Sequence, residues 1–267
     1  MSENKNRLLS GLILTLLIIF IIKIGGLFLF RLTLSIVAIL TLNEFLKIFK
    51  INDFLKFWGL GFSFLLPFFV KSYPPYSLLV LFYLLIFCIV ILLKEVKVEV
   101  LNSMFTFSFG IFYIPFLLTF LMSLRLFAGN TNVSENLVLF LLFVIWAGDT
   151  GSLYMGRRFG NTKLAPVISP NKTVAGTFGG LLFNVIAALL CKIFFLSFIT
   201  GFQVILFSLV IGLTGQVGDL VESYIKRCMK LKDSSSLIPG HGGMLDRIDS
   251  LLFAAPIFYY LLKLFQI

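Results

Sequence analysis

Long apolar runs separated by short polar segments form the main pattern along this chain. The runs are about 15 to 25 residues long, and a helix of that length crosses the roughly 30 Å hydrocarbon core of a bilayer. Runs this long indicate membrane-spanning helices and not the short strands of a barrel. We predict nine spans, with approximate bounds 8–22, 26–43, 55–70, 76–93, 104–123, 136–154, 175–196, 201–219 and 250–265.

The composition agrees with this pattern, because 59% of the 267 residues are hydrophobic and only 13% are charged. A soluble domain of this size does not reach such values. We therefore expect an all-α, polytopic integral membrane protein. The opening residues MSENKNR precede an apolar run without a small-residue cleavage site, which predicts a retained first helix and not a removed signal peptide.

Polar residues are divided unevenly between the two halves of the chain. Residues 1–135 hold about five plain apolar spans, whereas residues 136–267 hold the remaining spans and two long polar loops, 155–174 and 220–249. The sequence shows no linker or internal repeat between these parts. We expect one compact membrane domain with plain N-terminal helices and a catalytic C-terminal region.

Basic residues predict the orientation, because Lys and Arg near helix ends accumulate on the cytoplasmic side. With nine spans and a cytoplasmic N-terminus, sixteen of the 22 basic residues fall inside and six fall outside. This arrangement places both long polar loops in the cytoplasm. This orientation depends on a tight hairpin between Lys23 and Arg31. If one long tilted helix replaced the hairpin, the number of spans would be even and the predicted sides of the later loops would be exchanged.

The net charge of +10 is explained by this bias and by attraction to anionic lipid headgroups, so we expect no nucleic-acid partner. Cys88 and Cys191 lie in apolar spans, Cys228 lies in a polar loop, and the chain contains no CxxC pair. We therefore expect neither a disulfide nor a zinc site.

Three polar places in the C-terminal half carry candidate chemistry. The first is Asp149, in the segment WAGDTG, which we expect to end or interrupt an otherwise apolar helix. Asp-Thr-Gly also favours local hydrogen bonds, so the carboxylate either caps the next turn or serves a functional site. The sequence leaves both roles open.

The second place is the loop at residues 156–176. Pro166 and Pro170 exclude a continuous helix there. Thr173 comes just before a glycine-punctuated helix, and a helix N-terminus favours anions through its free N–H groups. A basic loop by itself indicates only which side of the membrane it lies on. The prolines and the helix start together favour a further role, in which the basic residues of the loop bind phosphate oxygens. These residues are Arg157, Arg158, Lys163 and Lys172.

The third place begins with Asp219, Glu222, Ser223 and Lys226. Their spacing of i, i+3, i+4 and i+7 puts them on one helix face if the eighth span continues past the membrane boundary. A cluster of charges at the end of membrane helices must face water, pair internally or bind a ligand.

Asp246 and Asp249 repeat the i, i+3 spacing before the ninth span, so two carboxylate pairs can converge on one cation. Oxygen ligands without cysteine indicate Mg²⁺, with Mn²⁺ as the alternative, and leave open a monovalent cation beside it. Metal, carboxylates and basic groups together are typical of phosphoryl and nucleotidyl transfer. The neighbouring basic residues are Lys226, Arg227, Lys230, Lys232 and Arg247.

His241, the only histidine, lies between glycines at the turn before the ninth span. It is either a general base or a donor of hydrogen bonds to phosphate, and we expect the second role.

The run from Ser223 to Asp249 resembles the signature of the phosphatidate cytidylyltransferases, the CDP-diacylglycerol synthases, and fixes more than ten positions of it. The matching residues read S-Y-I-K-R-x4-K-D-x-S-x2-I-P-G-H-G-G-M-L-D-R-I-D. The resemblance covers roughly residues 145–250 and departs at Ala175, where relatives often carry a polar residue. Upstream it includes Asp149-Thr150-Gly151, Lys163-Leu164-Ala165-Pro166 and Ser169-Pro170-x-Lys172-Thr173-x-x-Gly176. In the N-terminal spans only the hydropathy and Asn43-Glu44-Phe45 resemble the family.

This resemblance implies that the chain uses CTP and phosphatidic acid to make CDP-diacylglycerol and pyrophosphate, with Mg²⁺, in the bacterial inner membrane. We expect a metal site formed by Asp219, Asp246 and Asp249 with Glu222 or Ser223. We expect the remaining catalytic residues to be Lys226, Arg227, Arg247 and His241. We expect substrate contacts from Asp149, Arg157, Arg158, Lys163, Ser169, Lys172, Thr173, Ser223, Gly242 and Gly243. Because many small polytopic enzymes dimerise, we also expect a homodimer.

Two other classes of protein are alternatives. A membrane kinase of the dolichol or phytol kinase type also uses CTP, but transfers the terminal phosphate to an alcohol. An ion or metabolite transporter explains intramembrane charges such as Glu44, Asp149 and Asp219, yet such transporters usually contain internal repeats, and none is found here.

Overall fold

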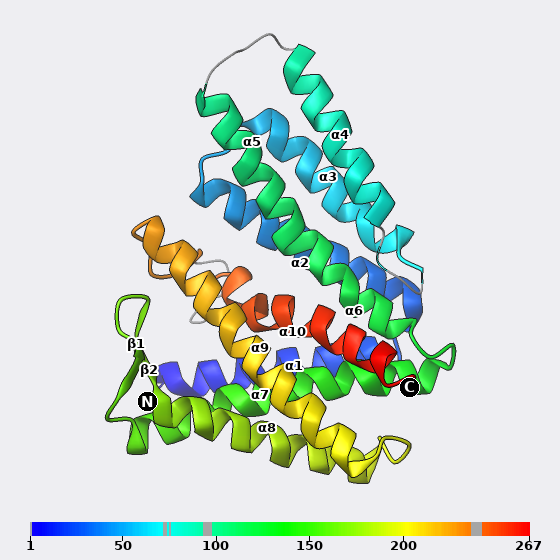
Figure 1. Cartoon of the computed structure of the whole chain (residues 1–267), viewed down its shortest axis with the longest axis vertical. Helices are drawn as coiled ribbons and strands as arrows, with labels where there is room; N and C mark the ends of the chain where they lie inside the picture. Colours follow the sequence, from blue (N-terminus) through cyan, green and yellow to red (C-terminus); the bar gives the residue numbers. More distant parts are fainter. Residues whose placement is uncertain (1, 72–73, 75, 93–97, 236–241) are drawn as a thin grey trace.

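A computed structural model of the chain describes residues 2–71, 74, 76–92, 98–235 and 242–267 (Figure 1). Its described residues form helices and one short β-hairpin. The elements are α1 (Ser2–Lys23), α2 (Gly26–Ile48), α3 (Asp53–Phe69), α4 (Tyr76–Leu92), α5 (Val98–Ile111), the π-helix η1 (Phe112–Phe116), α6 (Leu117–Arg125), α7 (Thr131–Phe159), β1 (Lys163–Ala165), β2 (Ser169–Thr173), α8 (Val174–Phe194), α9 (Gly201–Cys228) and α10 (Leu245–Leu264).

Each of the nine predicted spans coincides with a helical segment of the described chain. The fifth span is a continuous rod, in which η1 with Pro115 joins α5 to α6. The chain breaks between α1 and α2 at residues 24–25, so the predicted hairpin is present instead of one long helix. The helices differ from the predictions chiefly at their ends, since α7 continues to Phe159 and α9 continues to Cys228.

Five helical segments among the described residues are long and apolar enough to cross a membrane. They are α2, the rod Val98–Arg125, α7, α8 and α9. The helices α3 and α4 have 17 residues each, and the apolar part of α1 is Ile13–Lys23. The chain is therefore a helical, membrane-embedded protein.

The prediction that Asp149 ends or interrupts a helix is wrong. α7 continues from Thr131 to Phe159, with Asp149 in its interior, and its N-cap is the distant Asn130. The helix tolerates this carboxylate because Asp149 faces the cavity described below and not another apolar helix. The role of a local cap is thereby excluded.

The polar loop after α7 folds as the antiparallel hairpin β1–β2, whose strands pair Lys163 with Thr173 and Ala165 with Ser169. Pro166 follows β1 in the connecting turn, and Pro170 is the second residue of β2. As predicted, these prolines prevent a continuous helix. Figure 1 shows the hairpin projecting from the ends of α7 and α8, which lie side by side.

A buried asparagine connects α7, α8 and α9. Asn184 of α8 is only 1% exposed, and its amide lies between Gly148 of α7 and Gly212 of α9. A Cβ atom added at Gly148 would lie 2.0 Å from Asn184 Oδ1, and one added at Gly212 would lie 1.8 Å from Asn184 Nδ2. Small residues permit such close helix approach in membranes, and here they bring α7 and α9 together around the site.

We expect Gly212→Ala to destabilise the protein, because Asn184 is confined from both sides and cannot move away from the new methyl group. Overpacking of this kind costs about 1–3 kcal/mol. Thermal unfolding of the purified protein in detergent measures the effect. The matched control is Gly61→Ala in α3, where a Cβ atom meets nothing within 4 Å. Equal unfolding temperatures for the two variants would contradict the prediction.

Candidate active site

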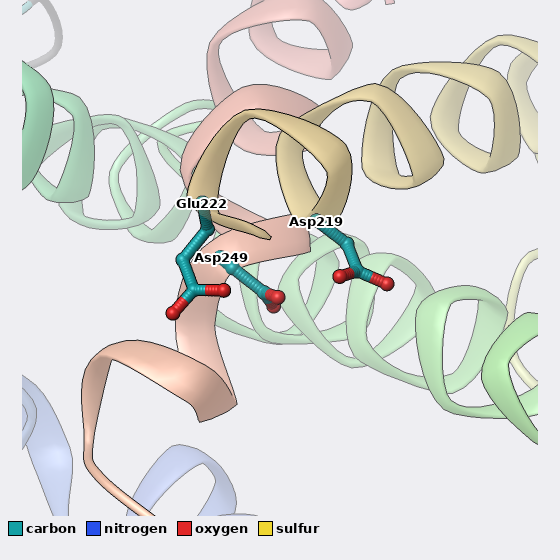
Figure 2. A group of neighbouring side chains, drawn as sticks. All are labelled: Asp219, Glu222 and Asp249. Atoms are coloured by element: carbon teal, nitrogen blue, oxygen red, sulfur yellow. The ribbon is translucent and has the colours of Figure 1, made fainter. Parts of the chain in front are cut away.

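Three carboxylates from α9 and α10 converge at the centre of the site. Ligand oxygens of Asp219, Glu222 and Asp249 all lie within 4.8 Å of one another. Figure 2 shows the side chain of Asp249 on α10 between those of Glu222 and Asp219 on α9. Because α9 continues to Cys228, the predicted i, i+3 spacing puts both α9 residues on one face. We call these three residues the carboxylate cluster.

The carboxylate cluster fits a hard divalent cation. Glu222 is 1% exposed, and its Oε1 atom has no hydrogen-bond partner among the described residues. A buried carboxylate oxygen without a partner is costly, and three like charges at this distance repel one another. A cation would remove both costs. Oxygen-only ligands agree with the predicted Mg²⁺ or Mn²⁺.

Lys226 lies beside the carboxylate cluster and joins it to Asp246. Its Nζ atom is 2.7 Å from Glu222 Oε2 and 2.5 Å from Asp246 Oδ1. The other oxygen of Asp246 accepts hydrogen bonds from the Ser234 amide, the Ser234 hydroxyl and the Gly243 amide. Asp246 is thus held by protein donors and lies outside the carboxylate cluster. Its predicted role as a metal ligand stays a prediction.

The charge of Asp246, which precedes the predicted ninth span, is stabilised by these contacts. Burial raises the pKa of its carboxyl group, but the hydrogen bonds from Lys226 and from the Gly243 amide, with the positive charge of Lys226, outweigh burial and lower the pKa to about 2. Asp246 therefore remains an anion near neutral pH and keeps Lys226 in place.

A cavity of about 620 Å³ lies between the hairpin, α7, α8 and α9. Lys172 on β2 forms an ion pair of 2.7 Å with Asp219, so the hairpin is tied to the carboxylate cluster. Thr173 caps α8, because its Oγ1 accepts a hydrogen bond from the Gly176 amide. Six predicted site residues line the cavity, namely Asp149, Arg157, Lys163, Lys172, Thr173 and Asp219.

Other predicted residues lie around this cavity without lining it. Arg158 lines a second, more open hollow along α7, beside Thr150 and Tyr154. Arg227 donates hydrogen bonds to the carbonyl oxygens of Ile168 and Leu231, and thereby links α9 to the hairpin. Arg247 is exposed on α10 and interacts electrostatically with Asp149.

The remaining predicted residues have local roles in the described structure. Ser223 donates a long hydrogen bond of 3.4 Å to Asp219, and Ser169 begins β2. Gly242 and Gly243 lie against Asp246 just before α10. His241 lies outside the described residues.

Several polar residues of the site were not predicted from the sequence. Ser152, Thr177 and Gln216 line the cavity, and Gln216 donates a hydrogen bond to the Thr177 carbonyl. Gln216 lies three residues before Asp219, so the same helical spacing could have identified it. Ser234 carried no such signal, because its contact with Asp246 joins a loop to a helix.

Comparison with known proteins identifies one family and several similar chains. The model of a family described as "Cytidylyltransferase family" matches residues 5–265. A Bacillus subtilis protein named phosphatidate cytidylyltransferase is 32% identical over 100% of both chains. Proteins of the same name from Staphylococcus epidermidis and Staphylococcus aureus are each 44% identical. Those two alignments cover 47% of this chain and 48% of each relative, about half the length.

We expect Asp249→Asn to raise the unfolding temperature of metal-free protein and to abolish its stabilisation by Mg²⁺. Burial of a carboxyl group beside two others is costly, so a neutral amide relieves the native state, and a weakened cation site no longer favours it. Thermal unfolding with chelator and with excess Mg²⁺ measures both effects. Glu99→Gln, at an exposed carboxylate of α5, is the control. An undiminished Mg²⁺ shift in Asp249→Asn would exclude this residue from the site.

Proposed function

Because the chain belongs to the cytidylyltransferase family, we propose that it transfers the cytidylyl group of CTP to phosphatidic acid in phospholipid synthesis. The products are CDP-diacylglycerol and pyrophosphate. The observation that carries the proposal is the carboxylate cluster at the edge of a basic cavity in a membrane-embedded protein. A polar site of this kind suits two polyanionic substrates, of which one is a lipid.

The reaction requires no nucleophile and no general base from the protein. An oxygen of the phosphatidate phosphate attacks the α-phosphorus of CTP, and the bond between that phosphorus and the oxygen bridging to the β-phosphate breaks. A phosphate monoester carries between one and two negative charges near neutral pH, since its second pKa is about 6. The nucleophile therefore requires no adjacent base. The task of the protein is to bring two anions together in line.

Basic residues of the cavity are suited to bind these phosphates. Lys163 and Lys172 approach from the hairpin, Arg157 approaches from α7, and the N-terminus of α8 borders the same space. Lys172 can exchange its ion pair with Asp219 for a substrate phosphate. The predicted phosphate contacts of Lys226 and Arg227 stay predictions, since both side chains already have partners within the protein.

A divalent cation would be held by Asp219, Glu222 and Asp249. When bound, Mg²⁺ neutralises phosphate charge and polarises the transferring group. Asp246 would hold Lys226 beside Glu222, so that the buried carboxylates keep a compensating charge.

The proposal includes nine spans, a cytoplasmic N-terminus and an active site facing the cytoplasm of the inner membrane. The distribution of basic residues supports this orientation. In Figure 1 the start of α1, the hairpin and the end of α9 lie on the left side of the molecule, and the C-terminus lies on the right. Division into residues 1–135 and a catalytic region 136–267, and assembly as a homodimer, stay predictions.

The reaction is tested with purified protein, phosphatidic acid, Mg²⁺ and CTP labelled separately at the α- and γ-phosphates. We expect label in the lipid phase from the α-phosphate alone, with release of pyrophosphate. Transfer of γ-label to an alcohol would instead indicate a kinase, and no transfer by folded protein would favour a transporter.

In the same assay we expect Asp219→Asn to lower turnover at least about a hundredfold, because loss of metal-assisted charge stabilisation costs several kcal/mol. Asp53→Asn, at an exposed residue of α3, should retain turnover. Full activity of Asp219→Asn would remove this residue from the metal site.

The orientation is tested with native Cys228, which is exposed at the end of α9. In a Cys88→Ser, Cys191→Ser background, a membrane-impermeant maleimide should label Cys228 in inverted vesicles and not in intact spheroplasts. A cysteine-free protein carrying Gln266→Cys should show the reverse. Labelling of Cys228 in spheroplasts would contradict the cytoplasmic site.

A further inference from the structure

A carboxylate from the N-terminal half of the chain is buried against the signature segment. Glu44 projects from α2 and is 5% exposed. It accepts hydrogen bonds from the Ser234 hydroxyl at 3.0 Å, the Ser235 hydroxyl at 2.6 Å, the Met244 amide at 2.9 Å and the Leu245 amide at 3.0 Å. Both of its oxygens are used, and all four donors lie within residues 234–245.

Glu44 acts as the cap of α10. The first N–H groups of a helix have no partner inside the helix, and a side chain at the N-cap usually accepts them. Met244, the N-cap residue of α10, makes no such side-chain hydrogen bond. The carboxylate of Glu44 accepts the Met244 and Leu245 amides instead, and its charge suits the positive end of the helix dipole. A cap supplied by α2 positions α10 relative to another helix and not only to its own loop.

A chain of contacts leads from Glu44 to the carboxylate cluster. The Ser234 hydroxyl lies 3.0 Å from Glu44 Oε2 and 3.0 Å from Asp246 Oδ2. A hydroxyl has one hydrogen, so the two carboxylates share this donor and their positions are coupled. Asp246 then holds Lys226, which holds Glu222 of the carboxylate cluster.

Gly243 leaves room for this arrangement. A Cβ atom at this position would lie 1.9 Å from Ser234 Oγ and 2.6 Å from Glu44 Oε2. Any side chain here would separate the serine from the glutamate. The need for glycine at residue 243 is therefore explained by the close approach of Glu44.

We propose that Glu44 is a positioning residue, which fixes the start of α10 and thereby the distance between Asp249 on α10 and its partners on α9. It acts through Ser234, Asp246 and the backbone of α10, without touching substrate. Any effect of Glu44 on turnover rests on the proposed function. Its effects on the start of α10 and on cation binding are measured without substrate and do not rest on that function.

The test compares Glu44→Gln with Thr41→Val in full-length protein in detergent. Glutamine keeps the size of the side chain but replaces one acceptor oxygen by a donor, which opposes one of the two amides. Thr41 lies one turn earlier in α2, is fully buried, and its hydroxyl has no partner among the described residues, so Thr41→Val is a matched control.

Two measurements without substrate decide the proposal. We expect Glu44→Gln to accelerate amide hydrogen exchange within residues 242–249. We also expect it to weaken Mn²⁺ binding, measured by electron paramagnetic resonance, about tenfold, the effect typical of losing a residue that orients a metal ligand. Thr41→Val should change neither. If the exchange rates and the Mn²⁺ affinity of Glu44→Gln lie within twofold of those of Thr41→Val, the proposal is overturned. A lower unfolding temperature with unchanged Mn²⁺ affinity would show a purely structural role and overturn it as well.

If Glu44→Gln does not fold, Ser234→Ala carries the same test, because it removes the hydroxyl shared by Glu44 and Asp246. We expect faster exchange within residues 242–249 and weaker Mn²⁺ binding, and unchanged values would overturn the proposal. Failure of wild-type protein to transfer α-label would refute the proposed function alone, since exchange and Mn²⁺ affinity are measured without CTP or lipid.

Discussion

The burial of several carboxylates at the meeting point of α9 and α10 is the constraint on which the rest of the site depends. Asp219, Glu222 and Asp249 lie too close together to remain charged without compensation. Lys172 compensates from the hairpin and Lys226 compensates from within α9. The negative charge that remains would be neutralised by the divalent cation proposed for this site.

The surrounding fold serves to hold these charges at fixed distances. The side chain of Asn184 on α8 packs between Gly148 of α7 and Gly212 of α9, which leave room for it. The hairpin closes one side of the cavity, and Arg227 ties it to the end of α9. Polar groups inside an apolar helix bundle are costly unless each has a partner, so the ion pairs of Lys172 and Lys226 also offset the cost of burying these carboxylates.

The contact of Glu44 with the signature segment changes how the two halves of the chain are viewed. The N-terminal helices resemble a plain membrane scaffold in sequence, yet α2 supplies the cap of α10. A substitution in α2 can therefore alter the site without touching it. This also accounts for Gly243, whose lack of a side chain lets Glu44 approach Ser234.

The sequence by itself determined the helical segments and the site residues that share one helix. The length of the apolar runs predicts these helices, because a helix that crosses the bilayer needs a minimum length. The spacing of Asp219, Glu222 and Lys226 places them on one face, because the helical period is a local property. The signature pattern, a resemblance over many positions, identified the family before any geometry was known.

Only the tertiary structure decided how these faces meet. Asp246 and Asp249 have the same spacing signal, yet Asp249 joins the carboxylate cluster whereas Asp246 is bound by Lys226, Ser234 and Gly243. Their different partners follow from how α10 packs on α9 and from which groups the preceding loop presents, and neither is encoded in local spacing. The role of Glu44, about 200 residues away along the chain, depends for the same reason on helix packing.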